Sequence, residues 1–268
     1  MPSNTLGIVA GNTNFPLRVA RDAKAEGLAV HAVCYEGETP EGIESIADSV
    51  EWIKVGELGR LIGSFKSKQV SQVVFAGGIN RVKLFGGVKL DLKGAALIAK
   101  LRSTKDDIIM RGIASELEGE GISVESCTMF CKEWLTPKGV LTKKAPSKEE
   151  QQDIEVGIEA IKKLGELHIG QLVVVKEGVI VAVEAVEGSD AAIKRGGELG
   201  KDGTVVIKFS KPTQDMRFDV PTVGLKTIES LESSGAKVLG LEADKSIILD
   251  KPEVIEAADK AKISIVGL

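Results

Sequence analysis

Histidine and cysteine are scarce in this chain. Its 268 residues include two histidines, His31 and His168, and three cysteines, Cys34, Cys127 and Cys131. The cysteine count is odd and the spacings match no common zinc pattern, which argues against a zinc finger or a disulfide scaffold. We therefore expect reduced thiols that mostly serve packing.

The chain also lacks long hydrophobic runs and a strong net charge. Its longest apolar stretch, 172–186, is interrupted by Lys176, Glu177 and Glu184, so no membrane span is expected. The N-terminus enters 6–10 without a basic region and cleavage site, which shows no secretory signal and predicts a cytoplasmic protein. A net charge of −4 argues against nonspecific nucleic-acid binding, and no nucleic-acid partner is expected.

Apolar periodicity is what the chain has in quantity. Hydrophobic residues make up 43% and charged residues 28%, as in globular proteins, and short β-branched runs alternate with amphipathic stretches. This alternation predicts an α/β architecture. The expected strands are 6–10, 28–34, 70–76, 170–175, 179–186, 203–209, 237–241 and 263–266, the fourth and fifth forming a hairpin. Helices are expected after Pro16 to about Glu26, and behind capping boxes at 104–107 and 147–150.

A polar, positively charged segment with turn residues divides the pattern near its middle. It runs from Thr136 to Pro146 and reads as a linker. We therefore expect an N-terminal α/β domain over 1–136, a linker over 137–146 and a C-terminal catalytic α/β domain over 147–268.

The stretch KPTQDMRFDVPTVG, residues 211–224, carries charges at alternate positions. If 214–220 is extended, Asp215, Arg217 and Asp219 point to one face and apolar residues to the other. Two carboxylates around a guanidinium suit a divalent metal and a phosphate. An exposed edge strand with protective charges and prolines explains the pattern equally well.

A second acidic segment, EAVEGSD at 184–190, passes from a strand toward a helix. It offers Glu187 and Asp190, with Arg195 further along the helix, at a strand end of the kind where α/β folds bind ligands. The alternative is structural: Ser189 would cap the helix and Asp190 would be a favourable first-turn acid.

Glycine-rich turns follow two of the expected strands. The pairs Gly11-Asn12 and Gly77-Gly78 would let backbone amides approach a nucleotide or sugar, although such turns are more often only turns. Neither the Gly-x-Gly-x-x-Gly fingerprint nor a phosphate loop is present, which argues against a dinucleotide oxidoreductase and a P-loop kinase. Lys105 stands at a capped helix start, where anions are favoured.

These segments occur in an ordered set that resembles a known family. The set comprises Ala-Gly-x-x-x-Phe-Pro at 10–16, the acidic element at 105–107, Gly-Gln before a strand at 170–171, the segment 184–190, and Gln-Asp-x-Arg-x-Asp with Pro-Thr-x-Gly within 208–224. Together they resemble the UDP-2,3-diacylglucosamine pyrophosphatases of the LpxI type over nearly the whole chain. Two departures are 12–14, where glycines are usual, and Ser189, where threonine is common.

The resemblance implies a fold, a reaction and partners. It implies a Rossmann-like N-terminal domain and a mixed α/β C-terminal domain, with the lipid product held in an interdomain cleft. The implied reaction is Mg²⁺-dependent hydrolysis of UDP-2,3-diacylglucosamine to UMP and 2,3-diacylglucosamine 1-phosphate in lipid A biosynthesis, with transient contact to the inner-membrane surface. A noncatalytic nucleotide-sugar or phospholipid-binding protein is the first alternative and a phosphotransferase with an unfamiliar site is the second, and a homo-oligomer is left open.

From these segments and the implied reaction we assign candidate residues. Asp215, Asp219 and Arg217 are the expected catalytic residues, Arg217 either binding phosphate or bridging the two aspartates. Asp215, Asp219, Glu187 and Asp190 are the candidate Mg²⁺ ligands, more carboxylates than one Mg²⁺ ion usually takes. The candidate substrate contacts are Gly11, Asn12, Gly77, Gly78, Lys105, Gln171, Ser189, Arg195, Lys208, Gln214 and Thr222.

Overall fold

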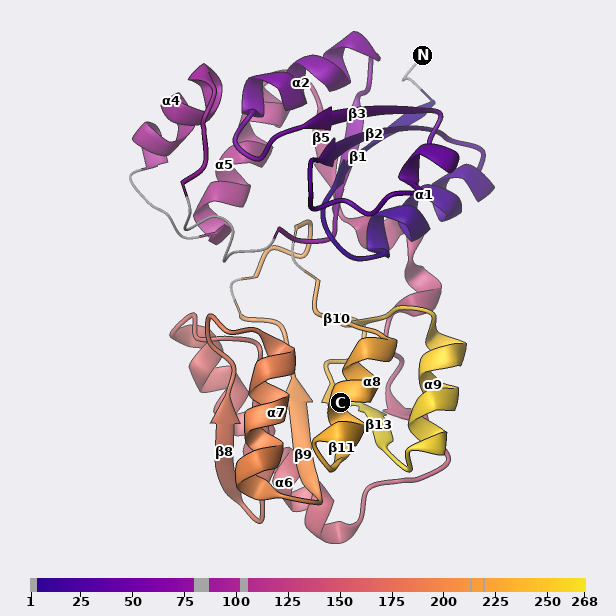
Figure 1. Ribbon diagram of the computed structural model, residues 1–268, viewed down its shortest axis with the longest axis vertical. Coiled ribbons are helices and arrows are strands. Elements are labelled where there is room, and N and C mark those ends of the chain that lie inside the picture. The colour runs from indigo at the N-terminus through magenta and orange to yellow at the C-terminus, as the bar shows by residue number, and fades with distance from the viewer. Residues whose placement is uncertain (1–3, 80–86, 102–105, 213, 219) are drawn as a thin grey trace. The chain divides into compact units, whose positions relative to one another are not determined.

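A computed structural model describes residues 4–79, 87–101, 106–212, 214–218 and 220–268 (Figure 1). The chain divides into two compact units. Unit 1 comprises residues 1–132 together with 215–219, and unit 2 comprises 133–214 and 220–268. The chain therefore passes between the units three times, and a short segment of its C-terminal half belongs to unit 1.

Unit 1 contains a five-stranded parallel sheet in the order β3-β2-β1-β4-β5. Its strands are β1 (Thr5–Ala10), β2 (Ala29–Tyr35), β3 (Ser49–Ile53), β4 (Gln72–Ala76) and β5 (Ser123–Glu125). Its described helices are α1 (Phe15–Ala25), α2 (Leu58–Ser67), α4 (Leu92–Leu101) and α5 (Asp106–Gly119), with short 3₁₀ turns η1 (Ile43–Ser45), η2 (Cys127–Phe130) and, at the border with unit 2, η3 (Lys132–Trp134). The order of connections reverses between β1 and β4, which makes their carboxyl ends a switch point of the kind that binds ligands.

Alternate strand residues of unit 1 face two helical layers. Val9, Val33 and Phe75 pack with α2, α4 and α5 in one buried cluster. Helix α1 packs against β1 and β2 through its own buried side chains. A parallel sheet covered in this way is a Rossmann-like arrangement, which confirms the fold expected for the N-terminal region.

Unit 2 contains a six-stranded mixed sheet in the order β6-β13-β11-β9-β7-β8, with a separate pair β10-β12. Its strands are β6 (Gly139–Val140), β7 (Leu172–Lys176), β8 (Val179–Val183), β9 (Thr204–Lys208), β10 (Thr222–Val223), β11 (Ala236–Leu241), β12 (Ile247–Ile248) and β13 (Ser264–Gly267). Its helices are α6 (Lys148–Glu166), α7 (Ser189–Gly200), α8 (Leu225–Ser233) and α9 (Lys251–Lys260). Strands β9, β11 and β13 are parallel, whereas β7 runs antiparallel to both β8 and β9.

The two faces of this sheet are covered by different helices. Val173, Val205 and Ile207 pack with α6, whereas neighbouring strand residues such as Val174 and Val206 pack with α7, α8 and α9. The expected mixed α/β fold of the C-terminal region is thereby confirmed.

Two local expectations in unit 2 are also confirmed. Ser147 and Glu150 form the capping box at the start of α6. The hairpin between β7 and β8 turns at Glu177-Gly178, where both residues have positive φ. Asp153, a buried residue of α6, accepts hydrogen bonds from both turn amides, at 3.0 and 2.6 Å. This carboxylate joins the hairpin to the helix that covers it.

The segment predicted as a linker, 137–146, lies within unit 2. Its strand β6 pairs antiparallel with β13 at the edge of the sheet. The backbone amide of Lys143 donates to Asp259 Oδ1 on α9 at 2.7 Å. Turn residues and positive charge indicate an exposed segment, but they do not show whether its backbone pairs with a sheet edge.

The cysteines and the membrane prediction also have structural outcomes. All three cysteines are free and buried, and burial raises the pKa of Cys34 and of Cys127 to about 12. They are packing thiols, as expected. In the parts of the chain that the structure describes, every helix is too short or too polar to cross a bilayer.

Candidate functional site

Residues 215–218 form a turn rather than the extended strand that alternation predicted. The amide of Phe218 donates to the carbonyl of Asp215 at 3.1 Å, which closes the turn. The carboxylate of Asp215 accepts the amide of Arg217 at 3.1 Å. An aspartate at the first position of a turn commonly makes this bond, and here it competes with strand formation. Asp219 lies outside the described residues.

This turn is packed against the carboxyl ends of strands in unit 1. The ring of Phe218 meets Phe75, the penultimate residue of β4, edge to face at 5.4 Å. Ser126, the first residue after β5, donates to the carbonyl of Met216 at 3.0 Å. The turn therefore lies at the edge of the sheet where the Rossmann-like fold binds ligands.

The side chain of Arg217 binds two carboxylates. Its Nε and Nη2 donate to the two carboxylate oxygens of Asp215 at 3.0 and 2.9 Å, and its Nη1 donates to Glu118 of α5 at 2.8 Å. The pKa of Asp215 is lowered chiefly by the hydrogen bond from the Arg217 side chain, against a burial effect that raises it, and the charge of Arg111 contributes. Two roles were expected for Arg217: binding phosphate, or bridging Asp215 and Asp219. In the structure Arg217 binds Asp215, and the second carboxylate that it binds is that of Glu118.

The glycine pairs expected at the substrate site meet each other after β1 and β4. The amide of Asn12 donates to the carbonyl of Gly78 at 2.7 Å, and the amide of Gly78 donates to Asn12 Oδ1 at 3.2 Å. A Cβ at Gly11 would overlap the carbonyl of Gly78, and one at Gly77, where φ is +81°, would overlap that of Asn12. These glycines allow two loops to approach at the switch point.

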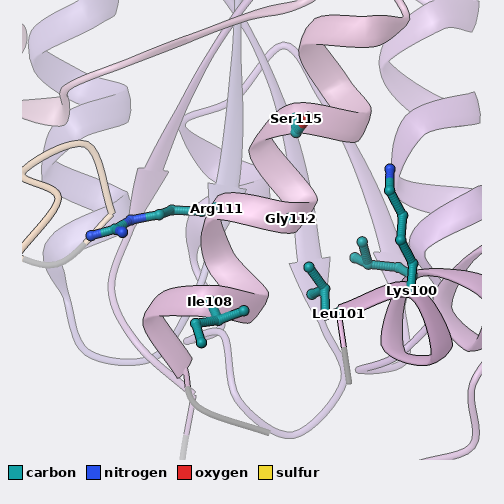
Figure 2. Close-up of a pocket in the computed structure, with 7 residues that line it drawn as sticks. Lys100, Leu101, Ile108, Arg111, Gly112 and Ser115 are labelled. Carbon is teal, nitrogen blue, oxygen red and sulfur yellow. The ribbon is translucent and has the colours of Figure 1, made fainter. Parts of the chain in front are cut away.

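A groove of about 350 Å³ lies between α4 and α5 in the same unit. Its lining is mostly apolar, from Leu97, Leu101, Ile108 and Gly112, with Lys100, Arg111 and Ser115 as the polar members. Figure 2 shows that the side chain of Arg111 extends away from Lys100 and Leu101 of α4. Lys105, the expected anion contact at the start of α5, lies outside the described residues.

In unit 2, several candidate residues gather where β8 and β9 end and β7 begins. Glu184, just after β8, accepts the amide of Gln171 at 3.1 Å and the hydroxyl of Ser189 at 3.0 Å. Gly188, and not Ser189, occupies the N-cap of α7, so the capping role considered for Ser189 is wrong. Its hydroxyl is turned to Glu184 instead. Gln171 and Ser189 are thus held by one carboxylate.

A second carboxylate, that of Glu242, holds the chain just after the end of β9. Glu242, which follows β11, accepts both the amide of Ser210, at 3.0 Å, and its hydroxyl, and it pairs with Lys245 at 2.7 Å. Burial raises the pKa of Glu242, but the donors from Lys245 and Ser210 outweigh it and leave this pKa lowered. Beyond Ser210, the side chain of Gln214 accepts the amide of Lys211 at 2.7 Å.

Lys208 and Thr222 contact neighbouring backbone carbonyls. Lys208 Nζ donates to the carbonyl of Thr222 at 3.0 Å, which joins β9 to β10. The Thr222 hydroxyl donates to the carbonyl of Val220 at 2.9 Å. These two candidate substrate contacts lie at the end of unit 2 where β9 ends and β7 begins, as Gln171 does.

The other acids proposed as metal ligands have cationic partners. Glu187 pairs with Arg195 at 2.9 Å, and Arg195 also donates to the carbonyl of Val183 at 2.6 Å. Asp190 is in the first turn of α7, as expected, and pairs with Lys226 at 2.8 Å.

These observations test whether the carboxylates suit a divalent metal. Both carboxylate oxygens of Asp215 are bonded to Arg217. Among the described residues no three Asp, Glu, His or Cys side chains gather as a metal-binding group. Asp219, one of the expected ligands, lies outside the described residues, so the Mg²⁺ site stays a prediction.

The sequence-based assignment missed several residues of these clusters, among them Phe75, Glu118, Ser126, Glu184 and Glu242. Glu242 follows the end of a predicted strand. Because ligands bind at strand ends in α/β folds, its position in the sequence could have indicated it. Glu118 has no comparable signal, because it is separated from Arg217 by 99 positions.

Comparison with known proteins covers nearly the full length. The profile of the LpxI N-terminal domain matches residues 5–134, and that of the LpxI C-terminal domain matches residues 137–266. A relative from Caulobacter vibrioides, UDP-2,3-diacylglucosamine pyrophosphatase LpxI, is 29% identical over 98% of this chain and 97% of its own length.

Solved structures are only distantly similar to this chain. The biotin carboxylase domain of a Hydrogenobacter thermophilus 2-oxoglutarate carboxylase matches 74% of this chain with 12% identity and a TM-score of 0.31. The biotin carboxylase subunit of a pyruvate carboxylase also matches 74%, with 14% identity and a TM-score of 0.28. The chain spans 41% and 42% of these proteins. Both family profiles and the full-length relative agree, and the chain belongs to the LpxI family.

Proposed function

We propose that this protein hydrolyses the diphosphate bond of UDP-2,3-diacylglucosamine, which releases UMP and 2,3-diacylglucosamine 1-phosphate in lipid A biosynthesis. Support comes from the two family domains and from the full-length relative, whose name gives this pyrophosphatase activity. The family motif Gln-Asp-x-Arg-x-Asp stands complete at 214–219.

The observation that carries the proposal is the position of Arg217 at the carboxyl ends of β4 and β5. A guanidinium is planar, always charged and matched to phosphate oxygens. Phosphoryl transfer depends chiefly on positioning and on stabilising negative charge. We assign Arg217 to the phosphate oxygens, and Asp215 to holding the guanidinium plane through its two hydrogen bonds.

Water activation and the metal are further parts of the proposal. Asp219 remains our candidate for orienting the attacking water. Mg²⁺, when bound, would neutralise phosphate charge. Glu187 and Asp190 remain metal candidates only if they leave Arg195 and Lys226.

In unit 2 we propose Gln171, Ser189, Lys208 and Thr222 as substrate contacts, with Lys208 supplying positive charge. The carboxylate of Glu184 would orient the first two, because it accepts from both. Gly11, Asn12, Gly77 and Gly78 would shape the loops of unit 1 at the switch point. Lys105, Arg195 and Gln214 remain predicted contacts.

The decisive test is release of UMP from the purified diacylated substrate with Mg²⁺ and without any second acceptor. Hydrolysis requires UMP and the 1-phosphate lipid to appear in equal amounts. Tight binding without release would favour the noncatalytic alternative. Full turnover in excess chelator, after bound metal is removed, would contradict the Mg²⁺ requirement while leaving the reaction itself intact.

We also propose a cytoplasmic protein that touches the inner-membrane surface transiently. Sedimentation with vesicles that contain the lipid substrate should carry part of the protein down, whereas vesicles without it should carry less. Analytical ultracentrifugation without lipid measures whether the chain forms a homo-oligomer.

A further inference from the structure

Helix α5 brings a carboxylate to the guanidinium that we assign to the phosphate. Glu118 Oε1 accepts a hydrogen bond from Arg217 Nη1 at 2.8 Å, although 99 positions separate the two residues. Glu118 thus lies outside the motif that contains Arg217, in the N-terminal half of the chain, and it binds the guanidinium directly.

The rest of the turn is anchored without this acid. Phe218 packs against Phe75, and Ser126 binds the carbonyl of Met216. The guanidinium carbon of Arg217 also lies 4.9 Å from the centre of the Phe218 ring. The ring and backbone contacts fix the position of the turn. The bond to Glu118 therefore affects mainly the direction of the Arg217 guanidinium.

The donors of Arg217 are divided between two acids. Nε and Nη2 bind Asp215, and Nη1 binds Glu118, so each nitrogen makes one of these bonds. A guanidinium has five N–H groups, two on each Nη. One N–H on Nη1 and one on Nη2 are therefore additional to these three bonds, and the two acids together set where they point.

We propose that Glu118 is a positioning residue for the phosphate-binding arginine: it fixes the guanidinium plane of Arg217 so that the additional N–H groups face the diphosphate. This inference rests on the proposed function, because it assumes that Arg217 contacts phosphate. It assigns Glu118 no contact with substrate.

The exposure of the pair predicts how the effect divides between stability and rate. The Arg217 and Glu118 side chains are 36% and 46% exposed. An exposed pair changes a folding equilibrium by a factor of about 1.5 to 5. Misplacing a catalytic contact costs far more in rate, on the order of 100-fold for an ångström. Loss of Glu118 should therefore affect kcat more than folding.

The first experiment compares Glu118→Ala and Glu118→Gln with Glu116→Ala. Glu116 lies on the same helix and pairs with Lys100 at 3.5 Å, so it is a matched control. We expect Glu118→Ala to lower kcat on the order of ten-fold, with KM within about two-fold. Glu118→Gln keeps an acceptor oxygen and should recover part of the loss. Equal kcat in Glu118→Ala and Glu116→Ala would overturn the proposal.

A double-mutant cycle with Arg217→Ala tests whether Glu118 acts through the arginine. If it does, the double variant should be about as slow as Arg217→Ala alone. A further loss equal to that of the single Glu118 variant would overturn the inference.

Failure of the proposed function is recognised separately, because the wild-type protein would then release no UMP. Nitrogen-15 NMR of the Arg217 side chain does not depend on activity. Its N–H protons should exchange with water several-fold faster in Glu118→Ala than in Glu116→Ala. Unchanged exchange would overturn the positioning role whatever the reaction.

Discussion

Arg217 binds Asp215 at two points although they are only two residues apart: Nε lies 3.0 Å from Oδ1 and Nη2 lies 2.9 Å from Oδ2. An extended strand would point both side chains to one face but would not close a turn between them. The turn thus brings Asp215 and Arg217 together as an ion pair, and Phe218 packs against the core of unit 1.

The ion pair predicts that Asp215→Asn affects activity more than stability. Asparagine keeps the size but places an amide beside a guanidinium that needs an acceptor. We expect a stability loss of about 1 kcal/mol for this partly exposed pair, and a loss of UMP release on the order of 100-fold. Urea denaturation and a UMP assay measure the two effects.

Asp244→Asn is the control for this substitution. Asp244 is exposed in unit 2 and has φ +59°, a conformation that asparagine tolerates. We expect normal UMP release from it. Near-normal turnover in Asp215→Asn would return the turn to a structural role.

Phe218→Ala should destabilise unit 1, although the residue lies late in the chain. Losing a half-buried ring and its edge-to-face contact with Phe75 should cost about 2 kcal/mol. Hydrogen exchange resolved by segment should quicken in β1 and β4 more than in β9 and β11. Leu225→Ala, on the exposed surface of α8, is the control. Faster exchange confined to unit 2 would contradict this assignment of the ring.

Gly11→Ala and Gly77→Ala should each cost more than about 2 kcal/mol of stability, because the added methyl group overlaps a carbonyl of the facing loop. Gly63→Ala is the opposite control: Gly63 lies at an exposed position of helix α2 with nothing near its Cβ, so the substitution should stabilise the protein by about 0.5–1 kcal/mol. Thermal unfolding of the three variants distinguishes these outcomes. Similar midpoints for Gly11→Ala and the wild-type protein would show that the loops separate readily.

His31 should make the protein less stable in mild acid. Its imidazole lies between the hydroxyls of Ser49 and Ser64 at 2.7 and 2.8 Å, and burial, aided by the charge of Lys68, lowers its pKa below 6.5. As pH falls below 6.5, the unfolded chain takes up a proton that the folded chain resists, so stability declines until the lower folded pKa is passed.

Urea denaturation at pH 7.5 and pH 5.5 tests this dependence. His31→Gln keeps polar atoms for the two serines and should remove part of the decline. His168→Gln, at the exposed second histidine, should leave it unchanged. An equal decline in wild type and His31→Gln would assign acid sensitivity to other groups.

Local patterns were sufficient for most secondary structure. The apolar runs placed β1, β7, β9 and β11 within a few residues, and the capping box placed the start of α6. Periodicity and capping depend on residues that are near one another along the chain, so the sequence contains their signals directly. The ordered motifs, taken together, also indicated the LpxI family.

The sequence by itself thus determined two α/β regions, their main strands and the segments that carry candidate chemistry. Tertiary structure alone decided that residues 215–219 belong with unit 1, and that Glu118 meets Arg217 there. The physical reason is that burying Phe218 and pairing Arg217 with Glu118 depend on partners about 100 positions or more away along the chain. Alternation of charged and apolar residues indicates only the faces of a strand, and here the Asp215 side chain binds the Arg217 amide within a turn instead.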